Sequence, residues 1–202
     1  MLTIPLQHRN QLSHIYRERG YRLGAEIGVE FGEYALALLG QWSGQLLLVD
    51  CWQHQPPEEY RDPICNRTDA EHEWVFRKFL DKVQGLGDRV AIWRMFSPEA
   101  AACVPDGALD FVYVDGNHNQ PAVAKDLPVW WRTIRPGGIF AGHDYFDPPT
   151  DMFGVKPAVD QFAATLQLPV QIIPGEYPLW APSWVIEKPH ANDVSGDSAG
   201  GG

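Results

Sequence analysis

The sequence predicts an α/β fold in which helices cover both faces of a doubly wound, mostly parallel sheet. Short apolar runs rich in β-branched residues alternate along the chain with segments whose apolar residues recur at helical spacing. Several of these runs stop at an acidic residue or a glycine, as expected where a buried strand reaches the edge of a sheet. The 202 residues, 45% of them hydrophobic, suffice for one sizeable core. We therefore expect a single domain over residues 1–188, followed by a disordered tail over residues 189–202 that is rich in Gly, Ser and Asp.

This alternation of apolar runs and helix-spaced segments predicts the bounds of the strands and helices. Strands are predicted over residues 25–27, 45–50, 89–93, 109–114, 139–141, 170–173 and 180–186, the last two as an antiparallel closing pair. Helices are predicted over residues 4–19, 33–39, 68–85, 123–134 and 155–166, with a short one beginning at residue 97. Thr68 and Glu71 have the spacing of a capping box.

A glycine loop follows the first predicted strand. Gly28 and Gly32 would let a ligand approach the backbone closely, and the next helix would offer unpaired N–H groups to it. Their spacing is Gly-x-x-x-Gly, whereas nicotinamide and flavin dinucleotide sites use Gly-x-Gly-x-x-Gly. Asp50 ends the second strand about twenty residues further on, the separation at which a carboxylate can bind ribose hydroxyls. We favour this role for Asp50 over that of a simple turn residue.

Residues 51–67 are Pro-rich, polar and aperiodic, which predicts a partly ordered lid over the ligand crevice. Trp52 directly follows Asp50, and two alternatives stay open for it, packing on a purine or packing in the core. Ser97 follows the third strand, where it could be the N-cap of a short helix or lie close to an adenine.

Acids and imidazoles follow two later strands. Asp115 ends one apolar run and precedes His118, while His143 and Asp144 follow the next run. In an open parallel sheet the carboxyl ends of the strands form the crevice where ligands bind, so we expect these side chains to converge. A neutral imidazole is a suitable proton acceptor near pH 7, which makes His118 and His143 candidate general bases. The alternative for either is a structural hydrogen bond.

Composition excludes several classes of function. The formal charge is −10, from 16 basic and 26 acidic residues, and no basic run is interleaved with aromatic residues, so a nucleic-acid partner is not expected. No apolar run could span a bilayer, and residues 1–19 are too polar for a secretory signal, so we expect a soluble cytoplasmic protein without a membrane partner. The three cysteines lack the spacing of a zinc site.

Four stretches together resemble class I S-adenosylmethionine-dependent methyltransferases. They are Glu26-x-Gly28-x-x-x-Gly32, the acid Asp50, the run DFVYVDGNH and the run RPGGIFAGHDY. More narrowly, the chain is similar to a small bacterial group, the methyltransferase family 24-like proteins, which share VDG(D/N)H and GGxxxGHDY. The resemblance extends from about residue 24 to residue 187. It implies a Rossmann-like sheet of seven strands, the last one antiparallel, with S-adenosyl-L-methionine across the first, second and fourth strand ends.

The resemblance also implies roles for single residues. The segment from Glu26 to Gly32 would hold the methionine moiety and Asp50 the ribose, while Ser97 would lie near the adenine. Asp115 would stand at the acidic position that ends the fourth strand.

Sugar and phenol O-methyltransferases among these relatives bind a divalent cation at the same strand ends. Asp115 and Asp144 match that arrangement, and oxygen ligands of this kind would suit Mg²⁺. Asn117 and His143 stand where those relatives carry further acids, so a metal is an alternative here and not the main expectation.

The expected function is S-adenosylmethionine-dependent O-methylation of a small-molecule hydroxyl on a sugar, a phenol or another secondary metabolite, by in-line transfer. The alternative is a protein of the same fold that binds the cofactor or a metal without methyl transfer. A nucleotide-binding oxidoreductase is disfavoured by the glycine spacing and by Glu26. The aromatic segment over residues 177–184 is either the surface of a homodimer or part of the core.

Overall fold

The computed structural model describes residues 6–147, 153–175 and 181–191, and in these residues it confirms the doubly wound α/β fold. One seven-stranded sheet has the order β3-β2-β1-β4-β5-β7-β6. The neighbours from β3 to β5 are parallel, whereas β7 runs antiparallel to both β5 and β6. The strands are β1 Leu23–Ile27, β2 Gln45–Asp50, β3 Val90–Arg94, β4 Leu109–Val114, β5 Ile134–Gly142, β6 Gln171–Ile173 and β7 Ser183–Glu187.

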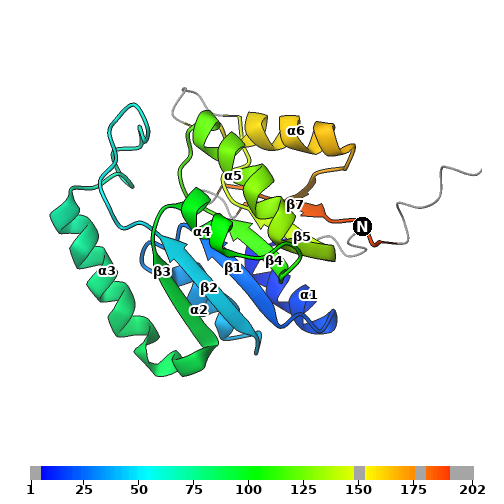
Figure 1. The fold of residues 1–202 in the computed structure, drawn as a ribbon, viewed down its shortest axis with the longest axis horizontal. Helices are drawn as coiled ribbons and strands as arrows, with labels where there is room; N and C mark the ends of the chain where they lie inside the picture. Colours follow the sequence, from blue (N-terminus) through cyan, green and yellow to red (C-terminus); the bar gives the residue numbers. More distant parts are fainter. Residues whose placement is uncertain (1–5, 148–152, 176–180, 192–202) are drawn as a thin grey trace, which may run out of the picture.

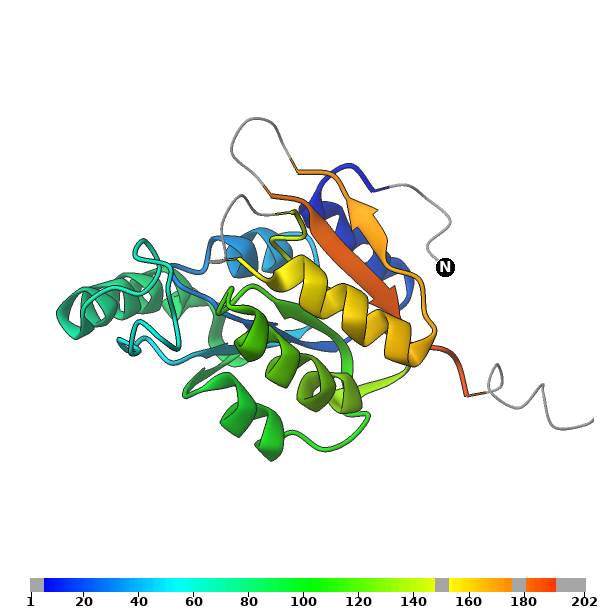
Figure 2. The same cartoon turned by 90° about the horizontal axis from the view of Figure 1, so that it is seen from above.

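Helices cover the sheet on both faces (Figures 1 and 2). The α-helices are α1 Leu12–Glu18, α2 Glu33–Leu39, α3 Asp69–Val83, α4 Ser97–Cys103, α5 Gln120–Thr133 and α6 Val155–Leu166, with 3-10 turns η1 Arg9–Gln11 and η2 Gln84–Arg89. Buried side chains of α1, α2 and α3 share one apolar cluster with one face of the strands, and those of α4, α5 and α6 share a second cluster with the other face. The sheet is therefore buried on both sides, which explains its continuous apolar runs.

Most predicted elements are found, several with the predicted bounds. β2, β4, α2 and α6 begin and end at the predicted residues, and β6 and β7 form the predicted antiparallel pair. The capping box is confirmed, because the Thr68 side chain accepts from the Glu71 backbone and Glu71 Oε2 accepts from Thr68 N at 2.9 Å.

The bounds of several predicted elements shift by one to three residues, and two elements differ more. β5 begins at Ile134 and not at Ile139, because Ile134 pairs with Leu109 and an irregularity in register lets the Pro-Gly-Gly segment belong to the strand. In the N-terminal segment, the α-helix starts only at Leu12, and the preceding turn is a 3-10 helix capped by His8.

Other expectations are tested only in part. Within the described residues, no helix combines the length and apolarity needed to cross a membrane. Trp184 is fully buried in the core, while residues 177–180 of the proposed dimer segment lie outside the described residues. Most of the predicted tail, residues 192–202, also lies outside them.

Candidate active site

A cavity of about 840 Å³ opens at the carboxyl ends of the parallel strands. Its walls come from the glycine loop after β1, the 51–67 loop after β2, the start of α4, the loop after β4 and the first half of α5. β1 lies between β2 and β4, so the strand order reverses direction here, which is where open α/β sheets bind their ligands.

The two loop glycines are required by sterics. Gly28 has φ +84°, and a Cβ on it would lie 2.1 Å from the carbonyl oxygen of Asp115. Gly32 has φ +76°, and its Cβ would lie 2.8 Å from the Phe79 ring. The first contact places the β1 and β4 loops directly against one another, and only glycine allows this approach.

Asp50 holds the glycine loop in place. Its Oδ2 accepts hydrogen bonds from the backbone N–H groups of Val29 at 2.9 Å and Glu30 at 3.0 Å, and its Oδ1 accepts from Trp52 N at 2.8 Å. Asp50 also lines the cavity, at the position predicted for a ribose-binding acid. The additional task of bracing the loop was not foreseen from the sequence.

Glu26 places a buried carboxyl on the cavity wall. Its side chain lies within β1 and is 2% exposed, and Oε2 has no hydrogen-bond partner in the described structure. Burial, and next to it the charge of Asp115, raise the pKa of this carboxyl well above its ordinary range. A cationic group bound beside Glu26 would offset that cost.

Two alternatives were left open for each of Trp52 and Ser97. The Trp52 ring is 1% exposed and packs on Phe76 and Phe79, while its Nε1 donates to Glu30 O at 3.0 Å, as the core alternative predicts. The residue also lines the cavity. Ser97 is the first residue of α4 and not its N-cap, which is Phe96. Its hydroxyl accepts from Trp130 Nε1 at 2.8 Å, and the residue lines the cavity.

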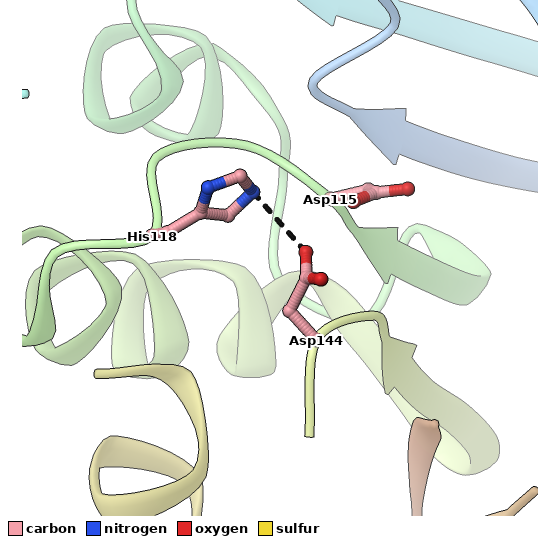
Figure 3. Close-up of side chains that lie close together, drawn as sticks. All are labelled: Asp115, His118 and Asp144. Carbon is pink, nitrogen blue, oxygen red and sulfur yellow. Dashed lines mark ion pairs between the residues drawn. The ribbon is translucent and has the colours of Figure 1, made fainter. Parts of the chain in front are cut away.

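On the β4–β5 side, His118 lies between two carboxylates. Nδ1 is 3.2 Å from Asp62 Oδ2. On the other side of the ring, Nε2 is 3.1 Å from Asp144 Oδ2, the contact drawn in Figure 3. Burial alone would lower the pKa of this imidazole, but the hydrogen bonds with Asp144 and Asp62 outweigh it and raise the pKa to about 10. His118 is therefore an imidazolium at neutral pH.

The same contacts keep both carboxyl groups ionised. The hydrogen bond with His118 is the main reason that the pKa of Asp62 falls to about 2. For Asp144, burial would raise the pKa, but the two neighbouring imidazoles hold it well below its ordinary range. Asp144 has φ +58°, a conformation that is uncommon for a residue other than glycine and that frequently marks a functional turn.

Asp115 and His143 complete this cluster. Asp115 Oδ2 accepts from Arg9 Nη1 at 2.9 Å, and its Oδ1 lies 3.6 Å from His143 Nδ1. The same His143 nitrogen is 3.3 Å from Asp144 Oδ1. His118 lines both the 840 Å³ cavity and an adjoining space of about 10 Å³, whereas His143 lines only the smaller space. The two candidate bases thus share Asp144, but only His118 borders the large cavity.

The 51–67 loop is docked onto the loop after β4. The Glu59 carbonyl accepts from Asn117 Nδ2 and from Asn119 Nδ2, both at 2.8 Å, and the Tyr60 ring meets His118 edge-on at 5.9 Å. Together with the Asp62–His118 contact, these bonds place the predicted lid over the crevice. Sequence reasoning missed Asp62 and Asn119, since nothing in an aperiodic loop indicates which of its polar residues face inward.

The predicted cation ligands do come together. Asp115, His118 and Asp144 each offer one ligand atom, and these atoms lie within 4.8 Å of one another. The imidazole in this set is His118, while the sequence had pointed to His143 as the neighbour of Asp144. Arg9, which contacts Asp115 from η1, was also missed.

A model of the methyltransferase domain family matches residues 25–145, the segment that contains the glycine loop, Asp50 and both acid–imidazole stretches. The chain belongs to this methyltransferase family. The protein is accordingly an S-adenosylmethionine-dependent methyltransferase, as the resemblance implied.

Solved structures share the fold of this methyltransferase at low sequence identity. A cofactor-bound protein from MTB is 15% identical with a TM-score of 0.66, covering 94% of this chain and 83% of that one. The O-methyltransferase from Bacillus cereus in complex with SAH is 15% identical with a TM-score of 0.62, covering 89% and 80%. The SAH-bound methyltransferase from Podospora anserina is 18% identical with a TM-score of 0.57, covering 87% and 75%.

Proposed function

We propose that the protein transfers the methyl group of S-adenosylmethionine to a hydroxyl group of a small molecule, such as a sugar, a phenol or another secondary metabolite. One observation carries the proposal: a single cavity joins an unpartnered buried carboxyl on the glycine-loop side to an acid–imidazole cluster on the lid side. Its volume, about 840 Å³, is in the range of sites for small ligands, about 300–1,000 Å³.

The cofactor is proposed to lie across the ends of β1 and β2. Glu26 would accept a hydrogen bond from the ammonium group of the methionine moiety, which would supply the cation that its buried carboxyl lacks. Asp50 would then face the ribose, and the adenine would extend toward Ser97 at the start of α4. Gly28 lines this side of the cavity and lets the cofactor approach the loop closely, whereas Gly32 packs against Phe79 and is not part of the lining.

His118 is the proposed proton acceptor. In the resting arrangement its Nε2 contacts Asp144, and we infer that the acceptor hydroxyl takes the place of Asp144 there. Loss of one carboxylate contact would lower the pKa of the imidazole toward neutrality, while Asp62 would still hold Nδ1. As its pKa falls, His118 releases its Nε2 proton to solvent and becomes a neutral imidazole. The hydroxyl oxygen then attacks the methyl carbon, the carbon–sulfur bond breaks, and the hydroxyl proton passes to Nε2. The products are S-adenosylhomocysteine and the methyl ether.

His143 is proposed to act through the carboxylates. Its Nδ1 lies near both Asp115 and Asp144, so it would position these carboxylates without touching the acceptor. Overall charge supports a small acceptor: with a net charge of −10 the protein would repel a polyanion, and the docked 51–67 loop narrows access to the cavity.

A divalent cation on Asp115, His118 and Asp144 is a second candidate for the lid side. Two carboxylates and an imidazole suit such an ion in composition, but the present pairings oppose it. Binding would require His118 to release its proton and Asp115 to release Arg9, so uptake of the cation would be coupled to proton release. Calorimetry with Mg²⁺ in two buffers of different ionisation enthalpy measures this proton release.

The test of the proposed function is formation of S-adenosylhomocysteine by the purified protein with a panel of sugar and phenol acceptors, with and without Mg²⁺. The expected result is turnover with at least one hydroxyl acceptor and no turnover with its methyl ether. Saturable cofactor binding without turnover on any acceptor would favour the alternative, a binding protein of the same fold.

The ribose assignment needs a separate test, because Asp50 also braces the loop. S-adenosylhomocysteine and its 3′-deoxy analogue can be compared on the wild-type protein. We expect the deoxy analogue to bind about tenfold more weakly, since the partly buried carboxylate of Asp50 then loses a donor. Equal affinity would leave Asp50 with the bracing role alone.

A further inference from the structure

One end of the cavity lies between α4 and α5, on the side away from Glu26. It is lined mostly by apolar groups, and its residues are Met95, Phe96, Ser97, Pro98, Pro121, Ala122, Lys125 and Asp126. Only three of these side chains, those of Ser97, Lys125 and Asp126, are polar. The proposed cofactor orientation would bring the adenine to this end, so its edge would meet one of these groups.

Asp126 is an unusual residue to find here. It projects from α5 and is 7% exposed, yet it belongs to the lining of the cavity. Burial raises the pKa of its carboxyl to about 6, and a hydrogen bond with the Ser97 side chain opposes that rise. Within the residues that the structure describes, Asp126 forms no ion pair with a Lys, Arg or His side chain. Burying an acid that has only one neutral partner lowers the stability of the fold. A bound ligand that donates a hydrogen bond to Asp126 would offset that loss.

The hydroxyl group of Ser97 already takes part in hydrogen bonding within the protein. Its oxygen accepts from Trp130 Nε1 at 2.8 Å. Because Ser97 lowers the pKa of Asp126, we infer that the hydroxyl hydrogen faces this carboxylate and not a base. A carboxylate has two oxygens and about four lone-pair sites, so Asp126 keeps accepting capacity beyond the bond with Ser97.

We propose that Asp126 recognises the adenine of the cofactor by accepting a hydrogen bond from its 6-amino group. The proposal rests on the cofactor orientation given under the proposed function, with the ribose at Asp50. An ionised carboxylate only accepts hydrogen bonds, which matches an amino group and repels the carbonyl oxygen that guanine and hypoxanthine carry at the same position. Asp126 is thus a specificity-determining residue for the purine.

A purely structural role makes a different prediction. If Asp126 only supported Ser97 and Trp130, its removal would weaken every purine ligand to the same extent. The two roles can be separated by the ratio of affinities for two ligands that differ at position 6 of the purine. A structural defect weakens both ligands equally and therefore leaves this ratio unchanged.

The experiment compares S-adenosylhomocysteine with S-inosylhomocysteine, in which an oxygen replaces the 6-amino group, by calorimetry on three proteins. The wild-type protein should prefer the adenosyl ligand at least about tenfold, the effect of leaving a buried acceptor facing another acceptor. Asp126→Asn should bring the two affinities within about threefold, since a carboxamide offers both a donor and an acceptor. Ser97→Ala, the comparison variant, keeps the carboxylate, so it should weaken both ligands to the same extent and leave the ratio of their affinities at the wild-type value.

Two results would overturn the inference: equal affinity of the wild-type protein for the two ligands, or an unchanged ratio in Asp126→Asn. The first needs no variant, so it stands even where Asp126→Asn does not fold. If the wild-type protein binds neither ligand, the cofactor assignment fails as well. Binding of S-adenosylhomocysteine without a preference contradicts the role of Asp126 alone.

Discussion

The glycine-loop side and the lid side of the cavity differ in the range of the contacts that build them. On the glycine-loop side, Asp50 at the end of β2 accepts a hydrogen bond from the backbone of Val29, which follows the neighbouring strand β1 and is 21 residues away. On the second, Asp62 and His118 are 56 residues apart, and Arg9 and Asp115 are 106 apart. The first side is formed by local backbone geometry, and the second exists only once distant loops have docked.

The two sides also differ in charge. On the glycine-loop side, burial raises the pKa of Glu26, so that side holds an acid without a cation. On the lid side, the imidazolium of His118 lowers the pKa values of Asp62 and Asp144, so that side is already neutralised from within. This difference is the reason for assigning the cationic cofactor to the first side and the neutral acceptor to the second.

The largest expected effect is that of Gly28→Ala. The new methyl group would overlap the Asp115 carbonyl and would require φ +84°, so the loops after β1 and β4 would have to separate. We expect S-adenosylhomocysteine to bind at least about a hundredfold more weakly, as a misplaced site loses several contacts together. Gly85→Ala is the control, because a Cβ there meets nothing within 4 Å. Unchanged affinity in Gly28→Ala would remove the glycine loop from the cofactor site.

The second-largest expected effect is that of removing the proposed general base. His118→Gln should lower the turnover number about a hundredfold or more, the range for a general base, whereas His143→Gln should lower it about tenfold. The difference follows from position, because His118 borders the large cavity and His143 does not. Turnover numbers on one acceptor, measured for both variants side by side, decide between them. A larger loss in His143→Gln would reverse the two roles.

The third prediction concerns docking of the lid. Asp62→Asn removes the carboxylate that holds His118 Nδ1, so trypsin should cleave the 51–67 loop after Arg61 or Arg67 several-fold faster. Glu59→Gln is the matched control. Glu59 contacts the neighbouring loop through its backbone carbonyl, which the substitution keeps. Equal cleavage rates in the two variants would mean that the ion pair does not hold the lid.

The smallest effect is on the pH dependence of stability. The pKa of His118 rises from 6.5 to about 10 in the folded protein, so its contribution is complete below pH 6.5 and disappears as the pH passes 10. The pKa of Asp62 falls from 3.8 to about 2, so its contribution is complete above pH 3.8 and disappears as the pH falls through 2.

The difference in melting temperature between the wild-type protein and His118→Gln should therefore be largest between pH 3.8 and pH 6.5 and should shrink toward pH 10. Each kcal/mol corresponds to about 2–4 °C for a domain of this size. Thermal unfolding across that pH range measures the difference. A difference that grows above pH 7 would contradict the imidazolium assignment.

The same contrast between local and distant contacts decides how much could be predicted from the sequence. The bounds of α2, β2, β4 and α6 follow from periodicity and punctuation, which are local signals, and the structure confirms them. Glu26, Gly28 and Asp50 line the cavity, as local signals at the ends of β1 and β2 led us to expect, and their contacts with the cofactor stay a prediction.

Residues with distant partners were not predictable in this way. The sequence around Trp52 is equally compatible with a ring that stacks on a purine and with one that packs in the core. Its packing on Phe76 and Phe79 is visible only in the folded structure. Arg9 and Asp62 belong to segments without periodicity, so no pattern indicates that they meet Asp115 and His118. The protonation of His118 was missed for the same reason, since it depends on two carboxylates from two different loops.

The division of the cavity into a cofactor side and an acceptor side is tested most directly by titrating S-adenosylhomocysteine into two variants. Glu26→Gln should weaken binding at least about tenfold, because the ammonium group loses its charged partner. His118→Gln should leave the affinity within about threefold of wild type. Loss of affinity in His118→Gln with normal affinity in Glu26→Gln would place the cofactor on the wrong side of the cavity and would contradict the account.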